Sequence, residues 1–211
     1  MVNINTKEYW NRQYSYEIEK GIDQQSDPIG WDLIIDKIKE GDNVLDFGCG
    51  KCEFLRYLLN KKSIGAYGVD HAEIALAYGF KQDERLRLTK SLKDLPVNSF
   101  DVITILHTIE HFDDPIKVIL ELKNFLKPNG ILIITWPIED KPWPQHVRIW
   151  KVEDVIELLE GLDCMYKILH RKEVVIPKGY RGFKDNHTLQ CYEDGTRKKE
   201  AIVFLKFDKD E

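Results

Sequence analysis

The 211-residue sequence lacks long apolar runs and has few cysteines. Its first residues contain no apolar segment typical of a signal peptide, and nowhere do about 18 apolar residues follow one another, as a membrane-spanning helix requires. We therefore expect a cytoplasmic protein without a membrane partner. The cysteines are too few for a disulfide framework at this length, and free thiols are expected at Cys49, Cys52, Cys164 and Cys191.

An excess of positive charge is also absent. The net charge is −5 and the isoelectric point is near 5.7, so no overall attraction to nucleic-acid phosphates or anionic lipids is expected. A local basic excess does occur between residues 171 and 199. It indicates a solvated surface first, with an anionic acceptor or RNA as the alternative. Nucleic acid is thus disfavoured as a partner, although it stays an open alternative.

Strand-like and helix-like segments alternate through most of the chain. The expected strands cover residues 44–47, 64–69, 100–106 and 131–136, and the helices that follow them cover residues 53–59, 72–78, 115–126 and 152–159. Repeated units of this kind predict a mainly parallel sheet with helices on both faces. Two later apolar runs, 164–169 and 201–207, predict an antiparallel pair at one edge, so the sheet is expected to be mixed. Residues 137–149 and 171–200 are expected to be long irregular loops.

The amino-terminal part precedes the first strand and is expected to be helical. Helices are predicted at residues 6–20 and 31–39, the second beginning near Pro28, because proline is tolerated in a first helical turn. A chain of this length favours one domain. Residues 1–40 would then be a helical flap over the carboxyl edge of the sheet, with Trp10 and Tyr14 on its first helix.

A glycine-rich loop follows the first strand, in the sequence VLDFGCGKCEF. Gly48 and Gly50 allow close approach of a ligand to the backbone, and the following helix offers unpaired N–H groups. Asp70 ends the second strand about 20 residues later, where a carboxylate can accept both hydroxyls of an adenosine ribose. Its alternative role is to cap the helix that follows. A dinucleotide site would need a glycine where the chain has Glu53, so NAD and FAD are disfavoured.

Two cysteines in this loop, Cys49 and Cys52, have the spacing of a redox pair or of half a zinc site. No second pair with this spacing occurs in the sequence. Isolated motifs of this kind are weak, so incidental loop cysteines are the favoured interpretation.

Five segments together resemble the successive motifs of class I S-adenosylmethionine (SAM) dependent methyltransferases that act on small molecules, such as those of ubiquinone biosynthesis. The segments are DFGCG (46–50), GVD (68–70), LPVNSFDVI (95–103), EHFDDP (110–115) and LKPNGILIIT (126–135). The resemblance covers roughly residues 40 to 160, and the motifs have the family's order and spacing. It implies a Rossmann-like, seven-stranded mixed sheet, mainly parallel with one antiparallel strand. Residues 41–211 would be the methyltransferase domain, with SAM across the carboxyl ends of its first strands.

The resemblance also implies roles for individual residues. Asp46, Gly48 and Gly50 would line the methionine half of SAM, Asp70 would hold the ribose, and His71 would lie by the adenine. Ser91 and Leu92 stand where the family often has an acidic residue that binds the adenine amino group. Cys52 replaces a third loop glycine that is common in the family.

Histidines and a carboxylate follow the fourth strand, where open α/β sheets bind their ligands. When the acceptor of a methyl group is a hydroxyl, a base helps to remove its proton, and histidine suits this role near neutral pH. We expect His107, His111 and His146 to be catalytic, and we expect His107 also to face the ligands, including SAM. For His111 a structural role is equally open, because in the family this residue often bonds to the backbone.

The same residues are weakly similar to a metal-binding arrangement, ExxEH…H, of ubiquinone-biosynthesis and small-RNA methyltransferases. The corresponding hypothesis is a divalent metal held by His107, Glu110, His111 and His146.

The function expected first is methyl transfer from SAM to a small molecule, most readily at oxygen and next at nitrogen. The alternatives are an RNA-end or other nucleic-acid methyltransferase and a SAM-binding regulatory protein without catalysis. The sequence has no amide–proline–aromatic motif of the kind used on base amines, which disfavours methylation of a nucleobase.

Overall fold

The computed structural model describes residues 4–22, 28–138, 144–175, 181–184, 188–191 and 197–207. Seven strands form one sheet, in the order β3-β2-β1-β4-β5-β9-β6. Their bounds are β1 Asn43–Phe47, β2 Gly65–Val69, β3 Arg87–Thr89, β4 Phe100–Leu106, β5 Leu126–Ile138, β6 Met165–Val175 and β9 Arg197–Lys206. β9 is antiparallel to both of its neighbours, and the other pairs are parallel. The predicted mixed, seven-stranded sheet is therefore confirmed.

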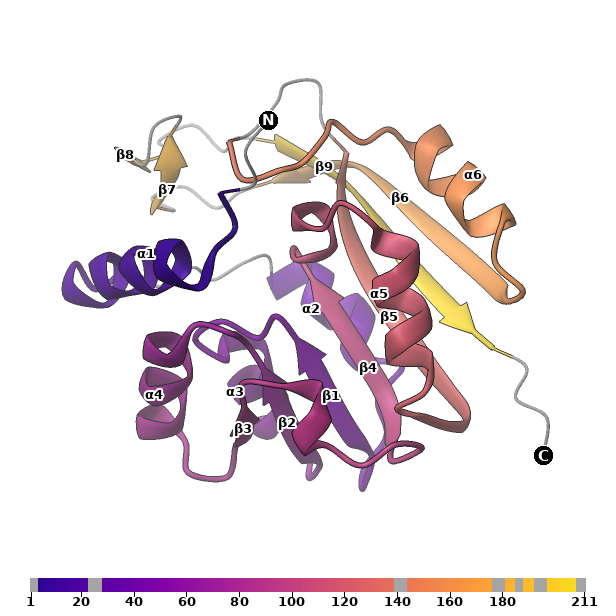
Figure 1. Ribbon diagram of the computed structural model, residues 1–211, viewed down its shortest axis with the longest axis horizontal. Helices are drawn as coiled ribbons and strands as arrows, with labels where there is room; N and C mark the ends of the chain where they lie inside the picture. The colour runs from indigo at the N-terminus through magenta and orange to yellow at the C-terminus, as the bar shows by residue number, and fades with distance from the viewer. Residues whose placement is uncertain are drawn as a thin grey trace.

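Helices cover both faces of the sheet (Figure 1). They are α1 Lys7–Glu19, α2 Pro28–Ile35, α3 Glu53–Leu59, α4 Glu73–Gln82, α5 Pro115–Lys123 and α6 Val152–Glu160, with 3-10 helices η1 Leu92–Asp94 and η2 Ile109–His111. Successive strand residues point to opposite faces. Leu45 and Ile103 accordingly pack with α5 and α6. Val44 and Val102 pack with α2 and α3 on the other face.

Three expectations about the elements need correction. Residues 127–130 (KPNG), left between the expected helix 115–126 and the expected strand 131–136, instead lie within β5, where the pairing with β4 shifts between Phe100 and Val102. The segment 171–200, expected to be a loop, contains strand residues and the hairpin of β7 Arg181–Lys184 with β8 Thr188–Cys191. β3 was not expected at all. These strands are held by main-chain pairing, which leaves no apolar pattern in the sequence.

The strand order reverses between β1 and β4, and the carboxyl ends of both strands lie at one edge there. Ligands of open α/β sheets bind at such a reversal. The glycine loop follows β1, η2 follows β4, and α1 lies beside α4 near the same edge (Figure 1). Within the described residues, no helix has the length and apolar character needed to cross a membrane.

Candidate functional site

The glycine loop turns through three residues in the left-handed region. The φ angles are 78° at Gly48, 49° at Gly50 and 62° at Cys52. A side chain in this region costs roughly 1–2 kcal/mol. Cys52 thus adopts a left-handed conformation of the kind that favours glycine, at the position where the family commonly has one.

Two side chains from distant segments close on these glycines. A Cβ added to Gly48 would lie 2.3 Å from Thr108 Cγ2, and one added to Gly50 would lie 2.7 Å from the Tyr14 hydroxyl. Thr108 follows β4 and Tyr14 belongs to α1. The glycines therefore let a residue before η2 and the face of α1 approach the loop. The sequence has no local signal for either contact.

Asp70 connects the loop to the turn after β2. Its Oδ2 accepts a hydrogen bond from the Gly50 N–H at 2.9 Å, and its Oδ1 accepts one from the Ala72 N–H at 2.8 Å. Burial raises the pKa of this carboxyl, whereas the two backbone hydrogen bonds lower it. The alternative of a helix cap is wrong, because α4 begins at Glu73 and Ala72 is its cap residue. His71, next in the chain, is exposed.

Asp46 lies deeper, at the end of β1, and is 3% exposed. Its Oδ1 accepts a hydrogen bond of 2.7 Å from the Thr104 hydroxyl. Burial outweighs this bond and raises the pKa of Asp46 to about 7. Asp46 and Asp70 repel each other's negative charge, so a cation placed between them would be favoured.

Ser91 and Leu92 lie at η1, beyond β3. The Ser91 hydroxyl accepts a hydrogen bond from the Lys93 N–H at 3.2 Å, and Leu92 packs against the core. An acidic residue, Asp94, does lie at this place. Its carboxylate accepts a hydrogen bond from the Thr89 hydroxyl at 2.6 Å. Asp94 was not expected, because the resemblance pointed to Ser91 and Leu92, and Asp94 lies two residues further on, at the end of η1.

His111 is held by a backbone carbonyl. Its Nδ1 lies 3.0 Å from the Gln145 carbonyl oxygen. A carbonyl can only accept, so Nδ1 carries the proton and Nε2 keeps a lone pair in the neutral ring. Burial lowers the pKa of His111, which favours this neutral form. A structural role of His111 would thus use Nδ1, and a chemical role would use Nε2.

Glu110 and His146 complete a cluster with His111. Glu110 is 2% exposed, its Oε1 lies 3.8 Å from His146 Nε2, and one ligand atom from each of the three residues lies within 4.8 Å of the others. Within the described residues, Glu110 Oε2 is buried and has no hydrogen-bond partner. These three side chains could hold a metal ion.

His107 is not part of this cluster, which corrects the four-ligand hypothesis. The spacing of His107 to Glu110 and His111 would place them on one face of an α-helix, but the chain turns sharply instead. His107 has a φ of 47°, and η2 starts only at Ile109. The His107 N–H donates to the Thr135 hydroxyl at 2.8 Å, which helps to hold this turn.

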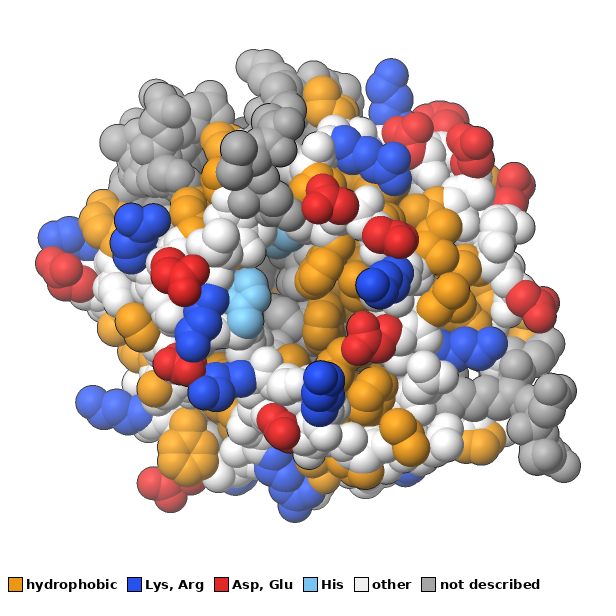
Figure 2. All heavy atoms as spheres, viewed as in Figure 1, with side chains coloured by type: hydrophobic (Ala, Val, Ile, Leu, Met, Phe, Trp, Pro, Cys, Tyr) orange, Lys and Arg blue, Asp and Glu red, His pale blue; other side chains and the backbone are white. Residues whose placement is uncertain are grey.

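Segments far apart in the chain surround the histidines. Asn5 donates to the Gln145 carbonyl at 2.7 Å, and Gln145 donates to the Tyr9 hydroxyl at 2.8 Å, across 140 and 136 positions of sequence. The ring of Trp10 lies 5.1 Å from that of His111, between centroids. Figure 2 shows a hollow in this face of the molecule, with histidine side chains at its rim and within it. Asn5, Tyr9 and Gln145 could not be recognised from sequence, because single polar residues in loops and helices carry no motif.

The cysteine pair fills space behind the loop. The sulfurs of Cys49 and Cys52 lie 3.7 Å apart and both residues are buried. A Cβ on Gly68 or Gly79 would lie 2.7 Å from one of these sulfurs. The tight packing supports incidental loop cysteines, and among the described residues neither thiol belongs to a cluster of metal-ligating groups.

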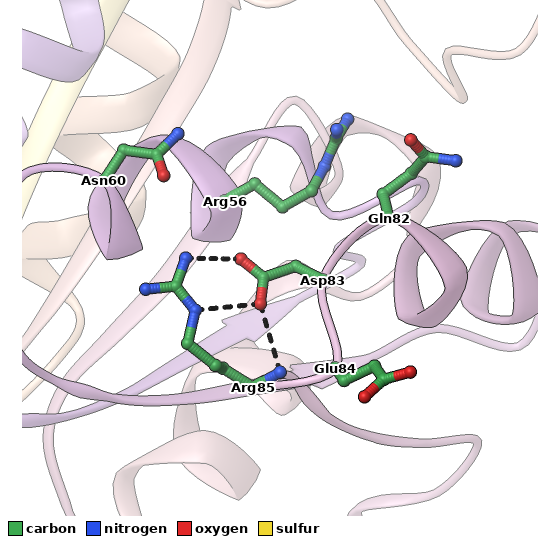
Figure 3. Close-up of a pocket in the computed structure, with 6 residues that line it drawn as sticks. All are labelled: Arg56, Asn60, Gln82, Asp83, Glu84 and Arg85. Atoms are coloured by element: carbon green, nitrogen blue, oxygen red, sulfur yellow. Dashed lines mark hydrogen bonds and ion pairs between the residues drawn. The ribbon is translucent and has the colours of Figure 1, made fainter.

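A cavity of about 640 Å³ lies at the opposite edge, where α3 and α4 end (Figure 3). It is lined by Arg56, Asn60, Gln82, Asp83, Glu84 and Arg85. Arg85 is paired with Asp83 at 2.6 Å. The cavity contains none of the predicted site residues, and we place the candidate site at the glycine loop instead.

The fold and the ligand-binding edge are those of a Rossmann-like protein, and comparison with known proteins identifies the family. A family model described as "Methyltransferase domain" matches residues 10–166, and the chain belongs to this family. The SAM-dependent methyltransferase from Aquifex aeolicus has the same fold, with a TM-score of 0.62 at 20% identity over 90% of this chain and 97% of that one. The predicted resemblance to class I SAM-dependent methyltransferases is thereby confirmed at the level of the family.

Relatives of known activity match only part of the chain. The ubiquinone biosynthesis O-methyltransferase of Actinobacillus pleuropneumoniae serotype 7 (strain AP76) is 32% identical over 107 residues, 45% of this chain and 45% of that protein. The tRNA U34 carboxymethyltransferase of Dichelobacter nodosus (strain VCS1703A) is 30% identical over 106 residues, 47% of this chain and 34% of that protein. The chain thus spans about half the length, or less, of these two relatives.

Proposed function

We propose that this protein is an enzyme that transfers a methyl group from SAM to a hydroxyl oxygen of a small molecule. The observation that carries the proposal is the hydrogen bond of His111 Nδ1 to the Gln145 carbonyl, which uses the ring proton and leaves Nε2 with a lone pair. Thr108 links this histidine to the glycine loop, because it contacts Gly48 and its carbonyl accepts from the His111 N–H at 3.1 Å. A base and a cofactor loop are therefore neighbours.

The cofactor half suits a positively charged adenosyl ligand. SAM supplies a methyl carbon bonded to a positive sulfur, and it also carries an ammonium group. Asp46 would attract these charges, and Gly48 and Gly50 would allow the methionine part to approach the backbone. Asp70 keeps lone pairs for the ribose hydroxyls beside its two backbone bonds. His71, Ser91 and Leu92 would surround the adenine, and His107 would lie where cofactor and acceptor meet.

The acceptor half supplies a place for the proton. When the acceptor oxygen forms its bond to the methyl carbon, its proton passes to His111 Nε2, and the electron pair of the broken bond stays on sulfur. A neutral imidazole is a weak base, so it suits a phenolic hydroxyl, whose pKa is about 10, better than an aliphatic one. The O-methyltransferase relative supports oxygen as the acceptor atom.

A metal-assisted variant of this function rests on Glu110, His111 and His146. Two imidazoles and a buried carboxylate with an unpartnered Oε2 fit a divalent transition metal. Such an ion would lower the pKa of an acceptor hydroxyl. Metal analysis of protein purified without chelator tests it: a stoichiometric ion that is lost in His146→Ala supports the variant, and a metal-free, fully active enzyme contradicts it.

Cofactor binding is the first test of the proposal. SAM and S-adenosylhomocysteine should raise the melting temperature and bind in calorimetry, whereas NAD and FAD should not. The control is Asp83→Ala, which removes a carboxylate at the far cavity and should bind normally. Asp70→Ala should lose binding. No binding of either SAM species to the wild-type protein would refute the proposal.

The acceptor class is tested next with labelled SAM. Phenols and catechols, amines, and transfer RNA are offered separately, and label in the product is measured. Methylated phenols support the proposal. Label in RNA would instead favour a nucleic-acid methyltransferase, which the tRNA-directed relative makes a fair competitor. Binding of SAM with transfer to none of these classes would favour a regulatory protein.

A further inference from the structure

A group of buried charges joins α1 to the glycine loop. Lys51 Nζ lies 3.2 Å from Glu17 Oε2 and 3.1 Å from Glu53 Oε1, and it donates to the Ile22 carbonyl at 2.6 Å. Glu17 is 0% exposed, Lys51 is 4% exposed, and the side chain of Glu53 is partly exposed, at 14%. We call Glu17, Lys51 and Glu53 the buried triad. Charged side chains are almost never fully buried unless they are paired, so this arrangement calls for a physical reason.

The triad places its members on the two parts that would enclose a cofactor. Glu17 belongs to α1, while Lys51 and Glu53 flank Cys52 in the glycine loop. Tyr14, three residues before Glu17 and therefore on the same helix face, lies against Gly50. The ion pairs accordingly fix the seating that brings the Tyr14 ring onto the loop.

Buried ion pairs and apolar contacts differ in the free-energy cost of separating the two surfaces that they join. Their attraction is largely offset by the loss of hydration, so they contribute little net stability, but they strongly disfavour any geometry that separates the charges without water. When α1 lifts away, Glu17 and Lys51 regain water. An apolar contact would instead expose hydrophobic surface on opening. A charged contact therefore suits a helix such as α1, which would have to dock on the loop in one orientation and leave it again in each catalytic cycle.

We propose that Lys51 is a positioning residue that seats α1 over the glycine loop through the buried triad, so that cofactor capture and release depend on this cation. The inference rests on the proposed function, because it takes the cofactor to bind between α1 and the loop. It also gives residues 1–40, predicted to be a flap, a definite point of attachment.

The chain offers a matched control at the other end of α1. Lys7 and Lys90 each lie 2.8 Å from Glu73 Oε1, and the side chains are 45%, 61% and 47% exposed, in that order. This network also joins α1 to the body of the protein. Exposed pairs contribute little, so Glu73→Gln separates the effect of burial from that of merely losing an ion pair.

The first experiment compares Lys51→Met with Glu73→Gln in the full chain. Hydrogen exchange of residues 7–19 reports how often α1 opens, and stopped-flow fluorescence reports S-adenosylhomocysteine binding. Lys51→Met should speed exchange of α1 by about tenfold or more and weaken binding about tenfold, mainly through faster dissociation, with exchange in β1 and β4 unchanged. Glu73→Gln should change neither quantity by more than about twofold.

The second experiment removes all three charges of the triad, in Glu17→Met, Lys51→Met, Glu53→Gln combined; the two most buried positions become apolar and the partly exposed Glu53 becomes a neutral amide. Slow hydrogen exchange of α1 should return in this variant, since apolar replacements of buried ion pairs are tolerated. Release should become slower than in the wild type, with dissociation of S-adenosylhomocysteine reduced about threefold or more. Unchanged exchange of β1 and β4 in the single variant shows that Lys51→Met is folded.

The outcomes separate this inference from the proposed function. If Lys51→Met and Glu73→Gln affect α1 exchange equally, or if Lys51→Met speeds exchange in β1 and β4 as much as in α1, or in no segment at all, the role of Lys51 is refuted. If the wild type binds no SAM species, the proposed function fails, but the exchange of α1 still decides whether the triad seats the helix. A triple variant that releases the ligand as fast as Lys51→Met would overturn the release argument.

Discussion

The two halves of the candidate site, which the proposed function assigns to the cofactor and to the acceptor, are built differently. The cofactor half, between β1 and β2, consists of a backbone turn and of carboxylates that lie within about one βα unit of each other in sequence. The acceptor half, around η2, is made of side chains from α1, from the turn after β4 and from the loop before α6, joined across more than a hundred positions. Thr108 and Tyr14 connect the halves through the two glycines.

This difference has a consequence for substitution. Backbone geometry in the cofactor half leaves no room for a new atom, so adding a single methyl group there should strongly reduce stability and cofactor affinity. In the acceptor half each side chain can be replaced by another of similar shape that keeps one of its bonds. Substitutions in the two halves should therefore reduce different properties of the protein. Four substitutions test this expectation, in order of decreasing effect.

The largest effect is expected for Gly48→Ala. Its Cβ would overlap Thr108, and the residue has a φ of 78°, so the unfolding free energy should fall by about 2–4 kcal/mol and cofactor affinity by more than about 100-fold. Gly41→Ala is the matched control, because Gly41 has a φ of 83° with nothing within 4 Å of the added Cβ. Urea unfolding and calorimetry measure both. Equal losses in the two variants would mean that backbone strain, rather than contact with Thr108, matters.

Next in size is the chemistry at His111. Asparagine can retain the donor at the position of Nδ1 but has no Nε2, whereas glutamine resembles the opposite edge of the ring. His111→Asn should keep its melting temperature and its S-adenosylhomocysteine affinity and lose about 100-fold or more in kcat. His111→Gln should lose stability as well, because the Gln145 carbonyl loses its donor. Full activity in His111→Asn would show that this histidine is structural.

A smaller, pH-dependent effect is expected at Asp46. Its pKa of about 7 means that the charged form, which attracts a cation, is partly lost below neutrality, so S-adenosylhomocysteine affinity should fall roughly eightfold from pH 7.5 to 6. Asp46→Asn should bind weakly without this dependence. Calorimetry at several pH values measures this affinity. If the affinity of Asp46→Asn changes with pH as much as that of the wild type, the pH dependence belongs to another group.

The same carboxyl should affect stability in the opposite direction. Its folded pKa lies above the ordinary value of 3.8, so the folded protein binds the proton more tightly. The stabilising contribution is present below about pH 4 and is lost as the pH rises through about 7. Asp46→Asn should flatten the fall in melting temperature between these values in the unliganded protein.

The smallest effect is expected at Glu73, outside both halves. Lys7 and Lys90 lower the pKa of its carboxyl to about 2, but the side chain is exposed to solvent. A lowered pKa contributes stability above the ordinary value that is lost only as the pH falls toward 2, and salt screens the interaction. Glu73→Gln should therefore leave melting temperature and kcat nearly unchanged at neutral pH. A marked loss at low salt would show that the position of α1 depends on its exposed charges after all.

Much of the fold was predictable because it depends on local patterns. The alternation of apolar runs with helical spacing located the main strands and helices, and the predicted helix at 53–59 and strand at 100–106 agree with α3 and β4. β3, β7 and β8 were missed, since short strands paired through the backbone need no apolar pattern. In the site, the motifs located Asp46, Gly48 and Gly50 at the glycine loop and Asp70 beside it, but they pointed to Ser91 and Leu92 rather than to Asp94.

What the sequence determined by itself was the sheet, the glycine turn and the family, because each follows from neighbouring residues whose spacing is repeated or fixed. Only the tertiary structure decided which nitrogen of His111 is free, that His107 stands apart from the Glu110 cluster, and that Lys51 meets Glu17. Those facts depend on contacts between segments that the chain order does not bring together. Such contacts leave no periodic trace in the sequence, and they exist only once the core has packed.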